Sequence, residues 1–268
     1  MRPSEWVIAV YFAYLIVTAV GSRLLPMPRR MRIASIGAAA LAELALMAQL
    51  PDSPALQVAR DWAPGPFLLV GYWLPGLFYT APNGRLERWL MRTDARLFAL
   101  KSVGGIATRA PRAVLELLEL SYLSCSVLVP GSFVFLYVFA DRVVGIRFWT
   151  AVLLAEFICY GLLPWLPSRP PRTLEGESPM DRRRLTGRWI NLWVLGRVSV
   201  QVNTFPSGHV AGSLIAAMIA WTAVPGLGIA MMVMASMIAV AAVIGRYHYA
   251  ADAVFGAVLA LAVFAIVG

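Results

Sequence analysis

Long apolar segments alternate with short polar ones along the whole chain. A helix needs about 20 apolar residues to cross the roughly 30 Å hydrocarbon core of a bilayer. Backbone polar groups in lipid must be satisfied within the protein, which favours helices. The pattern therefore predicts an all-α fold, a polytopic transmembrane helical bundle with eight spans. These are residues 5–22, 33–50, 65–81, 115–139, 148–166, 207–224, 226–244 and 249–267.

The composition agrees with a membrane protein. Hydrophobic residues make up 60% of the chain and charged residues only 14%, whereas roughly a quarter charged is usual in soluble domains. The first apolar segment follows Glu5 and has no convincing cleavage site, so we expect a retained span rather than a signal peptide. Cys125 and Cys159 lie inside apolar segments and indicate neither a disulfide framework nor a zinc site.

The basic residues are divided unequally between the two sides that eight spans define. Nineteen of the 23 lie on one side, in residues 23–32, 82–112, 167–206 and the turn before 249. Short basic loops stay in the cytoplasm, so the charge bias places this side there. The formal net charge of +9 then lies beside lipid head groups, which makes membrane lipids and phosphate better partners than nucleic acid.

Two of the basic loops have the pattern of amphipathic helices. Residues 85–100 carry arginines every three or four positions, opposite a face rich in leucine and tryptophan. In residues 182–196 a run of arginines precedes Trp189 and Trp193. Such helices lie in the head-group plane. They would be surface anchors, as arginine and tryptophan often are at an interface, or a platform for an anionic lipid.

Three polar segments carry the candidate chemistry. They are P-S-R-P-P-R-T at 167–173, P-S-G-H at 206–209 and G-R-Y-H-Y-A-A-D at 245–252. Both histidines of the chain, His209 and His248, lie in them. Each segment adjoins the end of an apolar span, and the parity of the spans puts all three on the basic side. We therefore expect them to meet at one membrane face.

His248 and Asp252 are four residues apart and share one face of a helix. The carboxylate can hold one imidazole nitrogen and direct the other, as a nucleophile or base requires. A carboxylate at the start of an apolar span is costly unless it is paired or functional. A pair that only packs two helices together would give the same spacing.

The segment at 206–209 has the features of an anion site. Pro206 can open a helix, Ser207 offers a hydroxyl and Gly208 lets a ligand approach the backbone. Free N–H groups at a helix N-terminus bind anions, and His209 would stand beside the anion as an acid or base. A capped helix start without any ligand would have the same sequence.

Arg172 follows two prolines that stiffen its loop. Arginine binds phosphate oxygens through two parallel hydrogen bonds. A solvated loop arginine is the simpler alternative.

Together the three segments resemble the motifs of the type 2 phosphatidic acid phosphatase superfamily, which also includes vanadium haloperoxidases and inositol- and sphingolipid-phosphotransferases. P-S-G-H and His248-x-x-x-Asp252 match in full. P-P-R is similar to the first motif of the inositolphosphotransferase-like branch, rather than to the longer lysine-containing form. The resemblance covers residues 65–268 and implies a six-helix catalytic core there. Residues 1–64 would be two additional N-terminal transmembrane helices and loops.

The resemblance implies phosphoryl transfer without a metal or other cofactor. His248, oriented by Asp252, would attack phosphorus and form a phosphohistidine. His209 would protonate the leaving oxygen and later deprotonate the acceptor. The phosphate of a lipid substrate would lie between Arg172, Arg246, Ser207 and the N–H groups around Gly208. With water as acceptor the protein is a lipid phosphatase, which we favour; with an alcohol such as inositol it is a phosphotransferase.

Arg246 departs from the family pattern. The common third motif places its arginine six residues before the histidine, whereas Arg246 precedes His248 by two. On a continuous helix this spacing would point Arg246 away from the face of His248, but Gly245 predicts a turn that would bring it round. The first-motif lysine is missing too, which leaves Arg172, with Arg169 as a substitute, to supply that charge.

Two other functions and one question of sidedness stay open. A non-enzymatic lipid transporter would need polar residues along a membrane path, which Glu43, Glu116, Glu119 and Glu156 would supply. A metal site could use both histidines and the motif aspartate, although the nearby arginines would repel a cation. The charge bias predicts a cytoplasmic catalytic face, whereas many relatives of the family act on the outer face.

Overall fold

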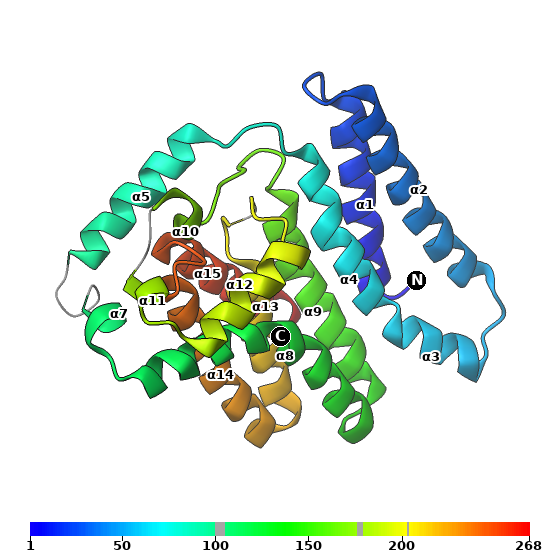
Figure 1. The fold of residues 1–268 in the computed structure, drawn as a ribbon. Coiled ribbons are helices and arrows are strands. Elements are labelled where there is room, and N and C mark those ends of the chain that lie inside the picture. Colours follow the sequence, from blue (N-terminus) through cyan, green and yellow to red (C-terminus); the bar gives the residue numbers. More distant parts are fainter. Residues whose placement is uncertain (100–104, 176–178, 203) are drawn as a thin grey trace.

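The structure, a computed structural model, describes residues 1–99, 105–175, 179–202 and 204–268. Within these ranges every regular element is a helix (Figure 1). The helices are α1 (Pro3–Gly21), α2 (Met27–Gln49), α3 (Pro54–Trp62), α4 (Pro64–Trp73), the 3-10 helix η1 (Leu74–Phe78), α5 (Gly84–Phe98), α7 (Ile106–Arg109), α8 (Arg112–Phe139), α9 (Arg142–Gly161), α10 (Pro171–Leu174), α11 (Pro179–Arg182), α12 (Thr186–Val198), α13 (Gly208–Ala223), α14 (Pro225–Ile244) and α15 (Ala250–Val267).

Six helices of the described chain are long and apolar enough to cross a membrane: α1, α2, α8, α9, α14 and α15. The prediction of an all-α, polytopic transmembrane bundle is confirmed, and the protein is an integral membrane protein. The number of full-length spans differs from the expected eight. The expected span at 207–224 contains α13, whose 16 residues reach only about 24 Å.

The expected span at 65–81 is divided into α4 and η1. Pro75 has no N–H group, so it cannot donate to the carbonyl of Gly71 one turn earlier. The hydroxyl of Tyr11 in α1 donates to that carbonyl instead, at 2.8 Å. The break in α4 is therefore stabilised by a contact from the first helix.

The short helix α13 occupies the centre of the bundle and packs against α8, α9, α14 and α15. Its inward positions are mostly small, and Ala211, Ala216, Ala217 and Ala220 are fully buried. Small residues let neighbouring helix backbones approach closely, which is how helices pack in lipid. Gly212 has no side chain because the carboxylate of Glu156 in α9 fills that space.

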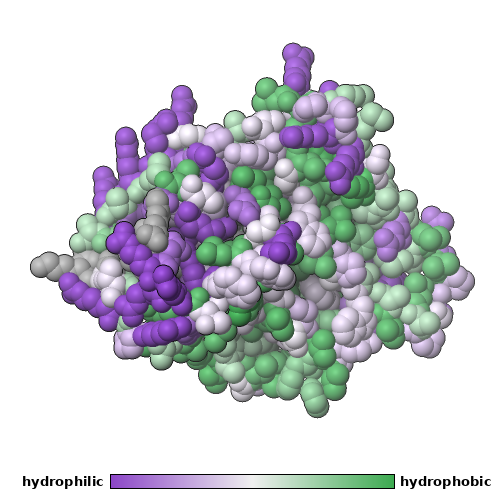
Figure 2. Space-filling view, viewed as in Figure 1, coloured by the Kyte–Doolittle hydropathy of each residue, from purple (hydrophilic) through white to green (hydrophobic). Residues whose placement is uncertain are grey.

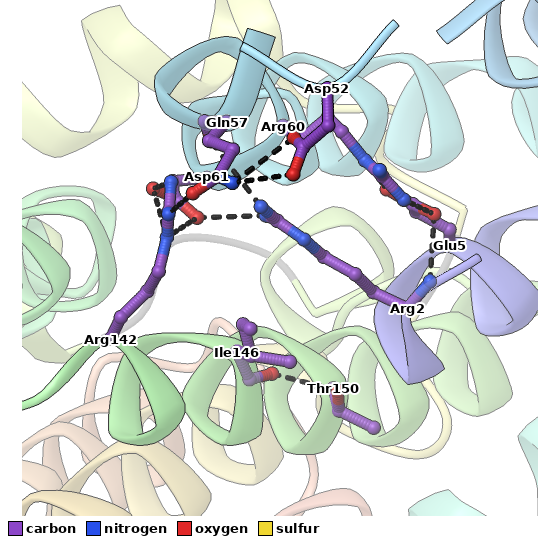
Figure 3. Close-up of polar contacts among 9 residues, drawn as sticks. All are labelled: Arg2, Glu5, Asp52, Gln57, Arg60, Asp61, Arg142, Ile146 and Thr150. Carbon is purple, nitrogen blue, oxygen red and sulfur yellow. Dashed lines mark hydrogen bonds and ion pairs between the residues drawn. The ribbon is translucent and has the colours of Figure 1, made fainter. Parts of the chain in front are cut away.

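The two N-terminal helices lie at one side of the bundle, with α1 packed against α2, α4 and α9 (Figure 1). A cluster of ion pairs ties α1 to α3 and α9 at one membrane face (Figure 3). Arg60 donates to Glu5 at 2.6 and 2.7 Å. Asp61 accepts from Arg2 at 2.7 Å and from Arg142 at 2.5 Å. This face is opposite the one that holds the histidine motifs.

Polar side chains gather over the part of the surface where α5, α7 and α11 lie (Figure 2). The predicted interfacial helix at 85–100 corresponds to α5 as far as Phe98, and residue 100 lies outside the described residues. The predicted segment at 182–196 ends within α12. Exposed apolar residues such as Val17, Val127 and Ile266 lie on the long helices, where lipid would cover them.

Candidate active site

The three motif segments come together at one end of the bundle. The backbone N–H of Arg172 donates to the carbonyl of Arg246 at 3.1 Å, which joins the first motif to the third. The N–H of Ser207 donates to the carbonyl of Asp252 at 3.0 Å, which joins the second to the third. The side chains of Ser168 and Thr204 share a hydrogen bond of 2.5 Å between the first motif and the loop before the second. Span parity predicted this meeting.

His248 lies in the tight turn between α14 and α15, and 6% of its surface is exposed. Its Nδ1 is 3.0 Å from the carbonyl oxygen of Thr204. A carbonyl can only accept, so Nδ1 carries the proton and Nε2 keeps its lone pair. Burial lowers the pKa of His248 to about 4; the bond to Thr204 opposes this shift, and the charge of Arg172 adds to it. The imidazole is therefore neutral over the physiological range.

Asp252 is fully buried and lies 3.4 Å from Nδ1 of His248. This distance exceeds the usual 2.7–3.2 Å of an N–H···O hydrogen bond. The same oxygen, Oδ2, accepts the backbone N–H of Tyr249 at 2.9 Å and so caps α15. The carbonyl of Thr204 thus makes the short contact that the sequence assigned to Asp252. No sequence signal identifies it, because every residue has a carbonyl.

The second motif forms the first turn of α13. Ser207 is the N-cap residue, and its hydroxyl accepts the N–H of Val210 at 3.4 Å. The ring of Tyr160 packs against Gly208 so closely that a Cβ there would lie 2.8 Å from Cε1. The first N–H groups of a helix have no partners within it, so this turn offers donors for an anion. The packing of Tyr160 therefore favours glycine at position 208.

His209 follows directly and faces His248, with 5.7 Å between the ring centroids. The ring of Tyr122 in α8 also lies beside His209, with 5.5 Å between the ring centroids. A small cavity of about 30 Å³ lies between the two histidines and the surrounding loops. Among the described residues it is lined by Tyr72, Tyr122, Tyr160, Pro170, Arg172, Leu195, Ser199, Gln201, Thr204, Gly208, His209, Tyr247 and His248. The histidines and one basic residue thus face a common space.

Among the described residues that line the cavity, Arg172 supplies the guanidinium group. Its Cζ lies 5.5 Å from the centroid of the Tyr247 ring, within the range of a cation–π contact. Burial lowers the pKa of Arg172, while Tyr122 and Tyr247 oppose this shift. Arginine stays protonated under all ordinary conditions, so the cavity contains a fixed positive charge.

The structure does not bring the guanidinium of Arg246 to this cavity. Arg246 has a φ of 61°, in the left-handed region, so the expected turn after Gly245 is present. Its side chain nevertheless pairs with Asp94 of α5 at 2.5 Å and with Glu175 at 2.8 Å. Its Cζ lies 4.5 Å from the centroid of the Phe98 ring. Arg169, the proposed substitute, is paired with Glu87 at 2.9 Å.

A second layer of residues behind Tyr247 was not foreseen. Tyr247 stacks on Tyr122 with ring centroids 3.9 Å apart, and its hydroxyl donates to Glu119. Arg188 of α12 covers the ring at 5.0 Å and donates to the carbonyl of Gly245. Asn191 also donates to Glu119, at 2.7 Å. These contacts hold the turn that carries His248 against α8 and α12.

Three of the glutamates that would have marked a transport path have partners. Glu116 accepts the backbone N–H groups of Thr186 and Gly187 at 2.8 Å. Glu156 accepts from Tyr160, and Glu119 belongs to the layer just described. No group of three or more histidine, cysteine, aspartate or glutamate side chains in the described ranges is arranged to hold a metal ion.

The family model of the PAP2 superfamily matches residues 88–266. Neither the curated proteins nor the solved structures contain a match to the chain. The match includes all three motif segments and leaves out α1 to α4. It does not resolve the branch of the superfamily, so the inositolphosphotransferase-like branch stays a prediction.

Proposed function

Because the chain belongs to the PAP2 superfamily, we propose that it is a membrane lipid phosphatase that works through a phosphohistidine on His248. Membership supports a phosphatase-type phosphoesterase acting on lipids. The observation that carries the proposal is the pair of histidines facing each other across a cavity that also contains Arg172. The substrate is a lipid phosphate monoester or diphosphate, whose head group lies where α13 begins.

The first step transfers the phosphoryl group to the enzyme. The lone pair of His248 Nε2 attacks phosphorus while the bond from phosphorus to the lipid oxygen breaks. His209 donates a proton to that oxygen, which leaves as an alcohol or, from a diphosphate, as a lipid monophosphate. The carbonyl of Thr204 holds the Nδ1 proton at 3.0 Å and stabilises the cationic phosphoimidazole ring.

The second step restores the enzyme. The deprotonated His209 takes a proton from water, whose oxygen attacks phosphorus. The N–P bond breaks, inorganic phosphate leaves and His248 regains its lone pair. Arg172 and the first N–H groups of α13 offset the charge on the phosphoryl oxygens in both steps, and such positioned charges supply most of the rate in phosphoryl transfer.

The alternative is that an alcohol, rather than water, accepts the phosphoryl group in the second step. The polar residues that line the cavity support this alternative. Tyr72, Tyr160, Ser199 and Gln201 also line the cavity, and their side chains carry hydroxyl and amide groups. Such groups recognise a polyol as well as they order water. With an alcohol such as inositol, the same intermediate would give a phosphotransferase.

The charge bias supports a cytoplasmic catalytic face. Ala95 on α5 is exposed and offers a labelling position in a chain whose Cys125 and Cys159 are replaced by serine and alanine. We expect Ala95→Cys to resist an impermeant maleimide in intact cells and to react after lysis. Labelling in intact cells would place the site on the outer face.

Phosphate release by the purified protein tests the proposed function. The substrates are phosphatidic acid and a polyprenyl phosphate in detergent micelles with EDTA, and the control is His248→Ala. We expect release from one of them that is lost by about a thousandfold or more in the variant. Equal release by the variant would overturn the role of His248. Release only from a phospholipid donor with added inositol would establish the phosphotransferase.

A further inference from the structure

The helix α5 lies over the motif segments with an unusual division of charge. Its arginines, Arg85, Arg88, Arg92 and Arg96, are exposed. Its acidic residues are buried: Glu87 is 5% exposed and Asp94 is 2% exposed. Leu90, which lies between them, is buried as well. Positions seven apart fall on one face of a helix. The helix thus turns its carboxylates towards the catalytic loops and its guanidinium groups away.

Glu87 holds the first motif. Its Oε1 accepts the backbone N–H of Arg169 at 2.9 Å and the Nε of the same residue at 3.0 Å. Its Oε2 accepts from Nη2 at 2.9 Å. Burial raises the pKa of Glu87, but the hydrogen bonds and charge of Arg169 outweigh this and lower it below the ordinary value. One carboxylate therefore fixes both the backbone and the side chain of the residue three positions before Arg172.

Asp94 holds the third motif from two sides. Its Oδ1 accepts the N–H of Ala250, the first residue of α15, at 2.8 Å. Its Oδ2 accepts from Arg246 at 2.5 Å, and the carbonyl of Arg246 accepts the N–H of Arg172 at 3.1 Å. His248 lies between Arg246 and Ala250 in the sequence. The buried carboxylate of Asp94 therefore binds residues on both sides of His248. It is linked to Arg172 only indirectly, through the backbone hydrogen bond between Arg172 and Arg246.

Packing supports the same arrangement. Leu90 is fully buried against Tyr249 and Ala251, and Trp89 packs edge-to-face on Phe205 at 6.1 Å. A buried ion pair is weak evidence for stability, because the desolvation of two charges offsets their attraction. A better-attested role of a buried ion pair is to fix the alignment of the structural elements that it joins. The ion pairs of α5 add polar contacts between this helix and the loops that carry the first and third motifs.

We propose that α5 is a positioning strap, and that Glu87 and Asp94 are positioning residues that set Arg172 and His248 in reactive geometry. The proposal rests on the proposed function for its effect on turnover, but not for its effect on His248. The test compares Asp94→Asn and Glu87→Gln with Asp61→Asn. Asp61 is a matched control: it is 5% exposed and pairs with Arg2 and Arg142 on the opposite face (Figure 3).

Two readouts separate positioning from general stability. We expect Asp94→Asn to lower kcat at least tenfold and Glu87→Gln to lower it less, while Asp61→Asn keeps kcat with a similar loss of thermal stability. In a ¹⁵N-histidine spectrum, Asp94→Asn should shift the His248 pKa upwards as the turn loosens, and Asp61→Asn should leave it in place.

A loss of kcat in proportion to the loss of stability, with an unchanged His248 pKa, would overturn the proposal. Higher turnover in Asp94→Asn would show that the carboxylate masks the site instead. If the wild-type protein releases no phosphate, the proposed function fails, and the His248 spectrum still decides the role of α5.

Discussion

The protonation state of His248 is the most quantitative consequence of the site. A nucleophilic imidazole needs a free lone pair on Nε2, and only the neutral ring has one. Burial sets the pKa of His248 at about 4, compared with 6.5 for a solvated histidine. At pH 5 a group with a pKa of 4 is about 90% neutral, whereas one with a pKa of 6.5 is only about 3% neutral. The structure therefore predicts a roughly 30-fold larger nucleophilic fraction at pH 5.

The direction of the shift also fixes its effect on stability. The unfolded chain binds a proton at His248 near pH 6.5 and the folded chain only near pH 4. The stability present above pH 6.5 is therefore lost progressively as the pH falls to about 4. The upper limit is about 3 kcal/mol, since one pKa unit corresponds to 1.36 kcal/mol.

Nuclear magnetic resonance measures this pKa directly, because the chain has only two histidines. The protein is labelled with ¹⁵N-histidine in micelles without substrate and titrated from pH 8 to pH 4. His209→Gln leaves one imidazole and assigns its signals. We expect His248 to remain the neutral tautomer protonated on Nδ1 down to about pH 5. A midpoint near 6.5, or a proton on Nε2, would refute the burial and the bond to Thr204.

Three further predictions concern the turnover and packing of the site. His209→Gln should lower turnover of a lipid phosphate by about 10²–10⁴-fold. The burst of p-nitrophenol from p-nitrophenyl phosphate should persist, because that leaving group needs no proton. An equal loss of both activities would contradict the role of His209 as the acid. Arg172→Lys should lower kcat/KM about tenfold to a hundredfold, since lysine replaces a forked donor with a point charge, and unchanged kinetics would place the phosphate elsewhere. Gly208→Ala should cost about 1–3 kcal/mol of stability through the clash with Tyr160, measured by thermal unfolding, and a Tyr160→Val background should remove most of that cost; a fully stable single variant would contradict the packing.

The sequence was a good guide to architecture because the bilayer imposes simple rules. Apolar length predicted the helices, and the parity of the spans predicted that His209, His248 and Arg172 would meet. The predicted membership of the superfamily is confirmed by the family model, which does not test the individual motifs. Pro75 marks the point where residues 65–81 divide, but the donor that stabilises the break, Tyr11, lies in another helix and has no sequence signal.

The finer arrangement of the site depends on contacts that spacing does not encode. Arg246 was expected to bind phosphate, but its guanidinium pairs with Asp94, which is 152 residues earlier in the chain. The carbonyl of Thr204 takes the short contact with His248, and backbone groups leave no mark in a sequence. The arginine stripe of α5 predicts an apolar opposite face, whereas the buried face also carries Glu87 and Asp94. The roles of the site residues stay predictions until variants are measured.

Trapping the covalent intermediate tests the central claim most directly. The purified protein is mixed with a ³²P-labelled lipid phosphate, quenched in alkali, which preserves phosphohistidine, and digested for mass spectrometry. We expect the label on His248, with more of it in His209→Gln because hydrolysis of the intermediate slows, and no label in His248→Ala. Turnover without a label on His248, or a label that persists in His248→Ala, would contradict the phosphohistidine mechanism.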